Sequence, residues 1–427
     1  MQINGFSKLS KKEKINWLLK TYFQQQPEAE KILTQYWHSD EELQKLHDGF
    51  IENTLSNFYL PYGIAPNFKI NNRLYAIPMV IEESSVVAAA AKAAKFWLDK
   101  GGFTTEILGL TKTGHIHFLY NGHTQELIQF FRENRSKLLS AIAPLEENMK
   151  KRGGGVKDID LIDKTDQIEH YYQIEFKFET ADAMGANFIN SVLEEAAEKL
   201  EKLAQSQLTG QLTILMSILS NFTPDCRVKA MVKCPVEALE TTAMTGKLYA
   251  EKFITAIKVA EKEPYRAVTH NKGIMNGVDA VVLATGNDFR AVEANAHAYA
   301  AISGQYTSLS HAKIEDNHFY FWLEMPLAVG TIGGIAGLHP LVKFSLQLLQ
   351  NPSAKELMQI IAAAGLAQNF AAVNSLITDG IQKGHMKMHL NNLLNFIKAD
   401  EKERQVAYAY FQNNKVSFAA LKKLLNR

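Results

Sequence analysis

Four short segments of the sequence carry polar side chains of the kinds that enzymes use for chemistry. They are residues 82–85 (EESS), 182–187 (DAMGAN), 269–277 (THNKGIMNG) and 384–386 (GHM). Carboxylic acids, lysine and histidine can move protons, and a lysine can also stabilise an oxyanion as it forms. The four segments therefore predict acid–base chemistry, although each also has a purely structural explanation.

The EESS segment lies between a strand-like run and an alanine-rich run, where a helix would begin. Carboxylates at a helix N-terminus interact favourably with the helix dipole. From the pattern alone, this structural explanation is the stronger one. The functional alternative is a carboxylic acid that stays protonated in a closed site and donates its proton.

The THNKGIMNG segment is dense in polar groups, and Asp288 follows Lys272 by sixteen residues. A lysine beside an aspartate is held in its charged form and can stabilise a developing oxyanion. The structural alternative is a surface turn with a solvated ion pair. The density of Asn, Lys, His and Gly between apolar helices favours a functional site.

The DAMGAN segment opens a helix after the longest predicted strand. Small residues there let a phosphate approach the exposed N–H groups, and the structural alternative is tight packing of the helix on the sheet. The pattern is not GxGxxG, so it does not predict a Rossmann fold.

The GHM segment contains His385, and His389 follows at the spacing of helical metal ligands. No acidic or cysteine partner is near them in sequence, so we do not predict a metal site. The two alternatives are a single histidine that acts as a general acid and a solvent-facing histidine.

Hydrophobic periodicity predicts the elements that position these segments. In the first half they are helices over 8–50, a strand at 73–81, a helix over 82–102, an alternating segment at 115–120 followed by a charged helix, strands at 158–163 and 170–180, and a helix over about 183–207. In the second half they are a strand near 227–232, helices at 237–262, 274–284 and 289–302, one or two strands at 319–332, and helices at 340–350, 354–365 and 367–380. The elements over 105–215 predict a small α+β domain.

Composition sets the class of protein. With 427 residues, 46% of them hydrophobic, the chain can bury a large core in two or three domains. The formal net charge of +1 does not favour nucleic acid or an anionic membrane. Two cysteines are too few for a disulfide framework and fit a reducing cytosol. We predict no signal peptide and no transmembrane helix.

Together these segments resemble hydroxymethylglutaryl-coenzyme A (HMG-CoA) reductase, specifically its soluble bacterial class. The resemblance extends from about Phe6 to Leu390, and DAMGAN and HNKGIMNG are its most specific motifs. The matching runs are EN at 52–53, LPYGIAPNF at 60–68, EESSVVAAA at 82–90, DAMGAN at 182–187, PYRAVTHNKGIMNG at 264–277, ATGND at 284–288, AVGTIGG at 328–334, GLAQN at 365–369 and GHM at 384–386.

The resemblance implies a four-electron reduction of HMG-CoA to mevalonate and CoA, with two nicotinamide cofactors. The implied catalytic set is Glu83, Lys272, Asp288 and His385. Lys272 would stabilise the oxyanion, and Asp288 would hold Lys272. Glu83 would supply a proton, and His385 would protonate the leaving CoA thiolate. Glu83 is chosen over Glu82 because it aligns with the single glutamate of the membrane-anchored class.

The resemblance also implies the binding residues, and it implies no metal. Arg266 would bind the distal carboxylate of HMG-CoA through two hydrogen bonds. The substrate set is Ser85, Arg266, Asn276, Gln368 and Glu52, and the cofactor set is Asp182, Met184, Gly185, Asn187, Gly330 and Gly333. Ser56 and Ser84 depart from the usual glycine and proline of the family, beside the site.

The implied fold is α+β, in three parts. A large mixed helix and sheet CoA-binding domain at 1–104 and 216–376 is interrupted by a smaller nicotinamide-dinucleotide-binding domain at 105–215. A helical C-terminal flap at 377–427 carries the histidine. The expected partners are HMG-CoA, mevalonate, CoA and a second copy of the chain, because the family's active site forms at a dimer interface. We expect a cytoplasmic protein that binds neither nucleic acid nor membrane.

Cofactor choice and reaction direction are open at this level. Lys157 would attract the 2′-phosphate of NADPH and Asp158 would repel it, and we expect NADPH with NADH as the alternative. The same enzyme could oxidise mevalonate with NAD in a degradative pathway. Two further alternatives are a non-catalytic CoA- or nucleotide-binding homologue and a different CoA-dependent acyl reductase. Arg266 argues against the last, since only a substrate with a distal carboxylate would need it.

Overall fold

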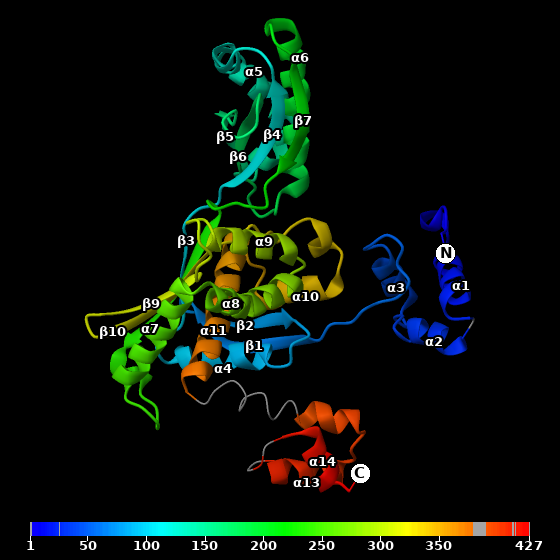
Figure 1. The fold of residues 1–427 in the computed structure, drawn as a ribbon, viewed down its shortest axis with the longest axis vertical. Helices are drawn as coiled ribbons and strands as arrows, with labels where there is room; N and C mark the ends of the chain where they lie inside the picture. Colours follow the sequence, from blue (N-terminus) through cyan, green and yellow to red (C-terminus); the bar gives the residue numbers. More distant parts are fainter. Residues whose placement is uncertain (1, 25, 379–389, 412–413, 415, 427) are drawn as a thin grey trace. The chain divides into compact units, whose positions relative to one another are not determined.

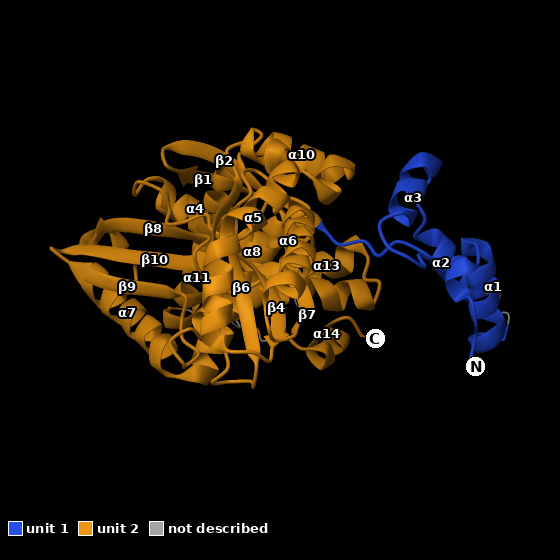
Figure 2. Ribbon diagram, turned by 90° about the horizontal axis from the view of Figure 1, so that it is seen from above, with its two compact units in different colours: residues 1–61 blue, residues 62–427 orange. Residues whose placement is uncertain are grey.

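The computed structural model describes residues 2–24, 26–378, 390–411, 414 and 416–426. Internal contacts divide the chain into two compact units, Met1–Pro61 and Tyr62–Arg427 (Figure 2). The first unit holds α1 (Lys11–Tyr22), α2 (Pro27–Gln35) and α3 (Glu41–Asp48). Ser10 and Glu13 form a capping box that begins α1. The helices predicted over 8–50 are confirmed.

The second unit, whose helices and strands are labelled in Figure 1, contains the largest hydrophobic core of the described residues. A four-stranded antiparallel sheet runs in the order β3-β8-β10-β9, and β1 and β2 form a separate hairpin. The strands are β1 (Tyr62–Ile70), β2 (Arg73–Val80), β3 (Thr104–Ile107), β8 (Arg227–Pro235), β9 (Ser310–Glu315) and β10 (His318–Pro326). The helices around them are α4 (Val86–Leu98), α7 (Gly246–Lys262), α8 (Pro264–Ala284), α9 (Phe289–Ala300), α10 (Pro340–Leu348) and α11 (Ala354–Ile377).

Helices α8 and α11 pack closely at two glycines. A Cβ at Gly277 would lie 2.7 Å from the carbonyl oxygen of Ala364, and a Cβ at Gly365 would lie 2.8 Å from Cγ2 of Val278. Only glycine permits this backbone approach. Gly365 therefore allows helix packing and does not end a helix, so the prediction of two helices over 354–380 was wrong and α11 is continuous.

A second hydrophobic core lies between another antiparallel sheet and two long helices. The sheet order is β5-β6-β4-β7, from β4 (Lys112–Tyr120), β5 (Gly155–Asp163), β6 (Tyr171–Glu179) and β7 (Leu212–Leu219). The two helices are α5 (Thr124–Lys150) and α6 (Ala186–Gln207). Strands β4 and β6 alternate buried and partly buried residues along their length, which confirms the strands predicted from alternation.

Two further parts of the second unit complete the fold. Near the C-terminus, α13 (Glu401–Phe411) and α14 (Phe418–Leu424) contribute to a small apolar cluster. Helix α11 is long and apolar enough to cross a membrane by length and composition, which the sequence prediction did not anticipate. However, 67% of its most apolar window is buried inside the protein, as is typical of a core helix.

Candidate active site

Lys272 and Glu83 form the central contact of the site. Nζ of Lys272 donates to Oε2 of Glu83 at 3.0 Å, although 189 residues separate them in sequence. Glu83 comes from the junction of β2 and α4, and Lys272 from the middle of α8. Their side chains are 36% and 62% exposed, so a ligand can reach both. The structure therefore places a candidate proton donor beside a candidate oxyanion-binding cation.

Asp288 contacts a different cation. Its Oδ1 accepts hydrogen bonds from the backbone N–H groups of Arg290 and Ala291 and so caps α9. Its Oδ2 lies 2.9 Å from the guanidinium of Arg290. Among the ion pairs of the described residues, the partner of Lys272 is Glu83 and not Asp288.

Lys272 and Arg266 both project from α8. The predicted helix at 274–284 lies within α8, but α8 begins earlier, at Pro264, and contains the whole THNKGIMNG segment, so the alternative of a surface turn was wrong. Its polar residues tolerate the helix since His270 and Asn271 are buried with hydrogen-bond partners. The functional groups are therefore held on a rigid element.

Arg266 is a partly buried cation. Burial lowers the pKa of its guanidinium, and within the described parts of the chain no carboxylate forms an ion pair with it. The backbone N–H of Arg266, in contrast, donates to Glu263 in the cap of α8. A desolvated guanidinium without a protein carboxylate is suited to bind an anionic ligand.

Three further predicted substrate residues, Ser85, Asn276 and Gln368, lie on α4, α8 and α11. Ser85 is the N-cap residue of α4, yet its side chain makes no capping hydrogen bond. Gln368 on α11 is 5% exposed, and its Oε1 has no hydrogen-bond partner among the described residues. Its Cβ lies close to Gly277, next to Asn276 on α8. This buried amide oxygen is able to accept a hydrogen bond from a polar ligand.

The DAMGAN segment forms a loop that leads into α6. Gly185 is the N-cap residue with φ of 95°, and no side chain caps the first N–H groups of this helix. A Cβ at Gly185 would lie 2.4 Å from Cγ2 of Thr180, so both the angle and the space require glycine. Asn187 is exposed in the first turn and Met184 is half-buried. These free N–H groups can bind a phosphate.

Lys112 holds this loop through three hydrogen bonds. It is 6% exposed, and its Nζ donates to Oγ1 of Thr180 at 2.6 Å and to the carbonyls of Ala183 and Met184 at 3.0 and 2.8 Å. Burial lowers the pKa of its ammonium group. Lys112 was not predicted, because it precedes the alternating segment predicted at 115–120 and its partners are distant in sequence.

The loop also pairs with the glycine-rich segment after β10. The carbonyl of Asp182 accepts from the N–H of Thr331 at 2.8 Å, and its carboxylate accepts from the N–H of Ala354 at 2.7 Å. The side chain of Asn287 exchanges two hydrogen bonds with the backbone of Gly330. A Cβ at Gly330 would lie 2.4 Å from the N atom of Met184. Gly330 therefore permits a close backbone approach.

Gly333 has a different position from Gly330. Its φ is 83°, and it is the N-cap residue of the short η3 helix (Gly334–Gly337). A Cβ there would meet no atom within 4 Å. The positive φ is the feature that favours glycine at this position.

A cavity of about 350 Å³ adjoins the loop. Its lining includes three cations, Lys112, Arg152 and Lys355, and two carboxylates, Glu179 and Asp182. The two residues expected to select the cofactor form ion pairs within the small sheet region: Lys157 with Glu179 at 3.3 Å, and Asp158 with Arg135. Because Lys112 is already hydrogen-bonded to the loop, Arg152 and Lys355 are the cations of this lining that remain to contact a ligand.

Two predicted site residues, Glu52 and His385, do not belong to the described part of the second unit. Glu52 belongs to the first unit, where it lines a cavity with Lys11, Lys14 and Asp48. His385 lies outside the described residues.

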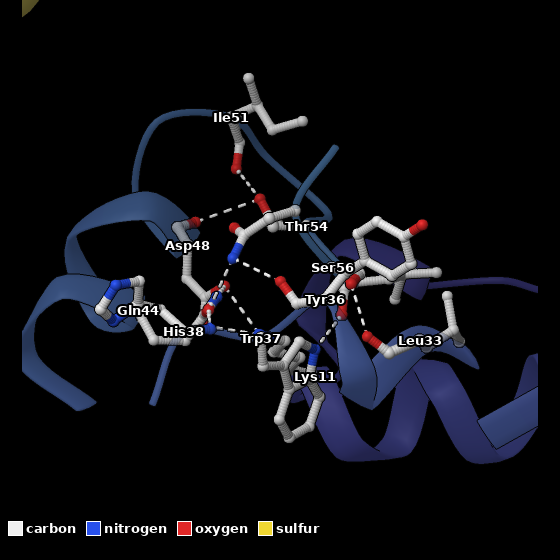
Figure 3. Close-up of polar contacts among 12 residues, drawn as sticks. Lys11, Leu33, Tyr36, Trp37, His38, Gln44, Asp48, Ile51, Thr54 and Ser56 are labelled. Carbon is white, nitrogen blue, oxygen red and sulfur yellow. Dashed lines mark hydrogen bonds and ion pairs between the residues drawn. The ribbon is translucent and has the colours of Figure 1, made fainter. Parts of the chain in front are cut away.

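The first unit also accommodates one departure from the family pattern. Oγ of Ser56 donates to the carbonyl of Leu33 at 2.6 Å (Figure 3). Asn57 donates to Gln44, and Lys11 pairs with Asp48. The hydroxyl of Ser56 thus contributes a hydrogen bond between the loop and α2.

Comparison with known proteins gives consistent similarities. The model of the hydroxymethylglutaryl-coenzyme A reductase family matches residues 11–390. The 3-hydroxy-3-methylglutaryl-coenzyme A reductase of Archaeoglobus fulgidus is 35% identical, and the alignment covers 100% of this chain and 94% of the relative. A probable reductase of the same name from Borreliella burgdorferi is 36% identical, with coverage of 82% and 78%.

Solved structures are similar over most of their length. A class II 3-hydroxy-3-methylglutaryl-CoA reductase from Streptococcus pneumoniae, bound to NADPH in open conformations, has a TM-score of 0.73 and 36% identity. The match covers 90% of this chain and 91% of that one. Another structure of the reductase from this organism has a TM-score of 0.73 and 35% identity, with coverage of 100% and 99%.

Proposed function

The chain belongs to the hydroxymethylglutaryl-coenzyme A reductase family, and on this premise we propose how its site works. The activity is that of an NAD(P)H-dependent oxidoreductase, which reduces HMG-CoA to mevalonate and CoA. The observation that carries the residue assignment is the 3.0 Å contact between Lys272 and Glu83. It joins the two most reactive predicted groups from distant parts of the sequence.

The reaction has two reductive steps, and the nicotinamide supplies a hydride in each. In the first step, Lys272 stabilises the oxyanion that forms when the thioester carbonyl becomes a hemithioacetal. Breakdown of the hemithioacetal releases the CoA thiolate, and His385 is the proposed donor of its proton. In the second step, Glu83 gives a proton to the oxygen of the aldehyde as it becomes an alcohol. Asp288 is proposed to hold Lys272 in the loaded site.

Arg266 is proposed to bind the distal carboxylate of HMG-CoA. Its support is a partly buried guanidinium that no carboxylate of the described residues pairs with. Ser85, Asn276 and Gln368 would take the remaining polar groups, since the Ser85 hydroxyl makes no cap and Oε1 of Gln368 has no partner within the described chain. Glu52 is also a proposed substrate-binding residue.

The cofactor is proposed to lie along the DAMGAN loop. The uncapped N-terminus of α6 and the close approach at Gly330 fit a pyrophosphate, with contacts from Asp182, Met184, Asn187 and Gly333. We further propose that 105–215 forms the dinucleotide-binding domain, 1–104 and 216–376 the substrate domain, and 377–427 a flap. NADPH is the proposed cofactor, supported by the cations in the adjoining cavity, and NADH is the alternative.

The assembly, location and direction are proposals of the same kind. We propose a homodimer whose interface completes the active site, and a cytoplasmic protein. Reductive synthesis of mevalonate is the favoured direction. The same residues would also catalyse mevalonate oxidation, because each step is reversible at one site.

The first test is consumption of reduced nicotinamide by the purified protein given HMG-CoA, with NADPH and NADH compared. Two cofactors consumed per mevalonate formed would support the proposal, and the ratio of kcat/KM values would decide the cofactor. Mevalonate, CoA and oxidised cofactor would test the reverse direction. A folded dimer without turnover in either direction would favour a non-catalytic CoA- or nucleotide-binding protein.

A further inference from the structure

Behind Arg266 lies a row of buried polar side chains from three elements. His270 on α8 is 1% exposed, and its Nδ1 lies 3.4 Å from Nη2 of Arg266, one helical turn earlier. Its Nε2 lies 2.7 Å from Oγ of Ser310 on β9. That hydroxyl donates to Oδ1 of Asn369 on α11 at 2.7 Å. The row links the guanidinium to a strand and to a second helix.

The chemistry of Arg266 fixes the direction of these hydrogen bonds. A guanidinium can only donate, so Nδ1 of His270 must carry a lone pair. The ring proton is then on Nε2 and is donated to Ser310. The amide nitrogen of Asn369 lies 3.2 Å from the same Nε2. With this tautomer Nε2 cannot accept from the amide of Asn369, so the hydroxyl of Ser310 is the acceptor of Nε2–H.

The imidazole is uncharged under ordinary conditions. Burial, together with the positive charges of Arg266 and His311, lowers the pKa of His270 to about 3. The row thus offers Arg266 a neutral acceptor. A carboxylate in that place would neutralise the guanidinium and compete with a substrate carboxylate. A neutral imidazole holds the guanidinium in place and leaves its charge available.

A purely structural role for His270 would duplicate its neighbour. Asn271 is fully buried, donates to the carbonyl of Thr307 at 2.8 Å and accepts from the N–H of Leu309 at 3.0 Å. These two hydrogen bonds already connect α8 to the segment just before β9. His270 adds two contacts that Asn271 does not make, one to Ser310 and one to Arg266.

We propose that His270 is a positioning residue for substrate recognition, which holds the Arg266 guanidinium toward the carboxylate of HMG-CoA through the row of Ser310 and Asn369. The proposal rests on the proposed function. It predicts that His270 affects binding of HMG-CoA and leaves binding of the nicotinamide cofactor unchanged.

The test compares two variants. His270→Leu keeps the bulk but removes the acceptor, and His270→Asn keeps a carbonyl oxygen near the position of Nδ1. We expect His270→Leu to raise the KM for HMG-CoA by about tenfold, the loss of one hydrogen bond to a charged group. The KM for NADPH should change less than about twofold, and His270→Asn should restore most of the HMG-CoA affinity.

A double-mutant cycle separates this role from general loosening of the core. In an Arg266→Ala background, His270→Leu should add less than about twofold to the KM for HMG-CoA, since it acts through Arg266. An equal rise in both KM values, or the full tenfold effect without Arg266, would overturn the proposal.

If the His270→Leu variant folds poorly, a smaller substitution at Ser310 still tests the proposal. Ser310→Ala removes the acceptor of Nε2–H, and we expect a selective rise of about threefold in the KM for HMG-CoA. No rise there would contradict the proposal. Absence of HMG-CoA turnover in the unmodified protein would count against the proposed function. Turnover with unchanged KM values in His270→Leu would count against the role of His270 alone.

Discussion

At the residue scale, the ionisable groups differ in their burial and in their charged partners. Lys272 and Glu83 pair with each other at an accessible position. Arg266 is partly desolvated without a carboxylate partner among the described residues. Asp279 on α8 is different again, because burial and the neighbouring Glu293 raise the pKa of its carboxyl to about 8. Each environment leads to a different measurable consequence.

Replacement of Lys272 should separate binding from catalysis. Lys272→Ala should lower kcat by about 10²–10³-fold, because Lys272 stabilises charge that develops in the transition state. Binding of HMG-CoA, measured by calorimetry, should stay within about threefold, since the proposed partner of the substrate carboxylate is Arg266. Retained turnover in the variant would contradict the role assigned to Lys272.

Asp279 should make the protein less stable as pH rises. Its folded-state pKa is above its usual value near 4, so the folded state binds the proton more tightly, and stability falls between pH 4 and 8. Asp279→Asn cannot ionise and keeps a donor for Glu293. We expect it to raise the Tm at pH 8 by about 2–4 °C and to change it little at pH 5. An equal shift at both pH values would contradict this.

At the element scale, the site depends on the distance between helices α8 and α11. Gly277 and Gly365 set that distance, and α8 carries Arg266 and Lys272 on either side of His270. The periodicity of the sequence predicted helices here, but it divided α11 into two helices. It also began the helix of α8 at residue 274, whereas α8 begins at Pro264. A glycine is read locally as a helix breaker, whereas the reason for Gly365 is a contact with Val278 on another helix.

Two glycines on α8 provide a matched pair of substitutions. Gly277→Ala would place a Cβ 2.7 Å from a backbone carbonyl and should destabilise the protein by about 1–3 kcal/mol and lower kcat. Gly273→Ala would place its Cβ 4.0 Å from Ala372 and should be neutral or stabilising by up to about 1 kcal/mol. Thermal unfolding of the two variants checks this, and equal behaviour would refute it.

The DAMGAN loop, where the cofactor is proposed to bind, is held by Lys112 at the start of β4. Lys112→Met should raise the KM for NADPH by at least about tenfold, because three hydrogen bonds to the loop are lost. The KM for HMG-CoA should change little. Lys177→Met, an exposed lysine on β6, is the control. A similar effect of both variants on NADPH would show that general charge, and not the loop, is responsible.

At the scale of the whole molecule, sequence patterns and spatial contacts gave different kinds of information. Alternation predicted β4 and β6, and the motifs predicted which residue types carry the chemistry. The contact between Lys272 and Glu83 spans 189 residues, so no local pattern could give it, and only the family resemblance placed both in one site. Lys112 was missed for the same reason, since its partners lie 68 to 72 residues away.

The proposed dimer makes a prediction about concentration. If a second copy completes the site, specific activity should fall to near zero when dilution converts dimers to monomers. Mass photometry at each concentration would report the oligomeric state beside the activity. Constant specific activity through the transition would show that one chain contains a complete site.

The attachment of Asp182 to α11 has a consequence for how the two substrates communicate. The carboxylate of Asp182 accepts the first N–H of α11, and Gln368 lies fourteen residues further along the same helix, about 21 Å away at 1.5 Å per residue. Helix α11 thus contacts the proposed cofactor loop at one end and carries a residue of the proposed HMG-CoA pocket further along. We expect a tilt of α11 on binding one ligand to change the site of the other. Thermodynamic linkage then requires HMG-CoA and NADPH to change each other's affinity by the same factor.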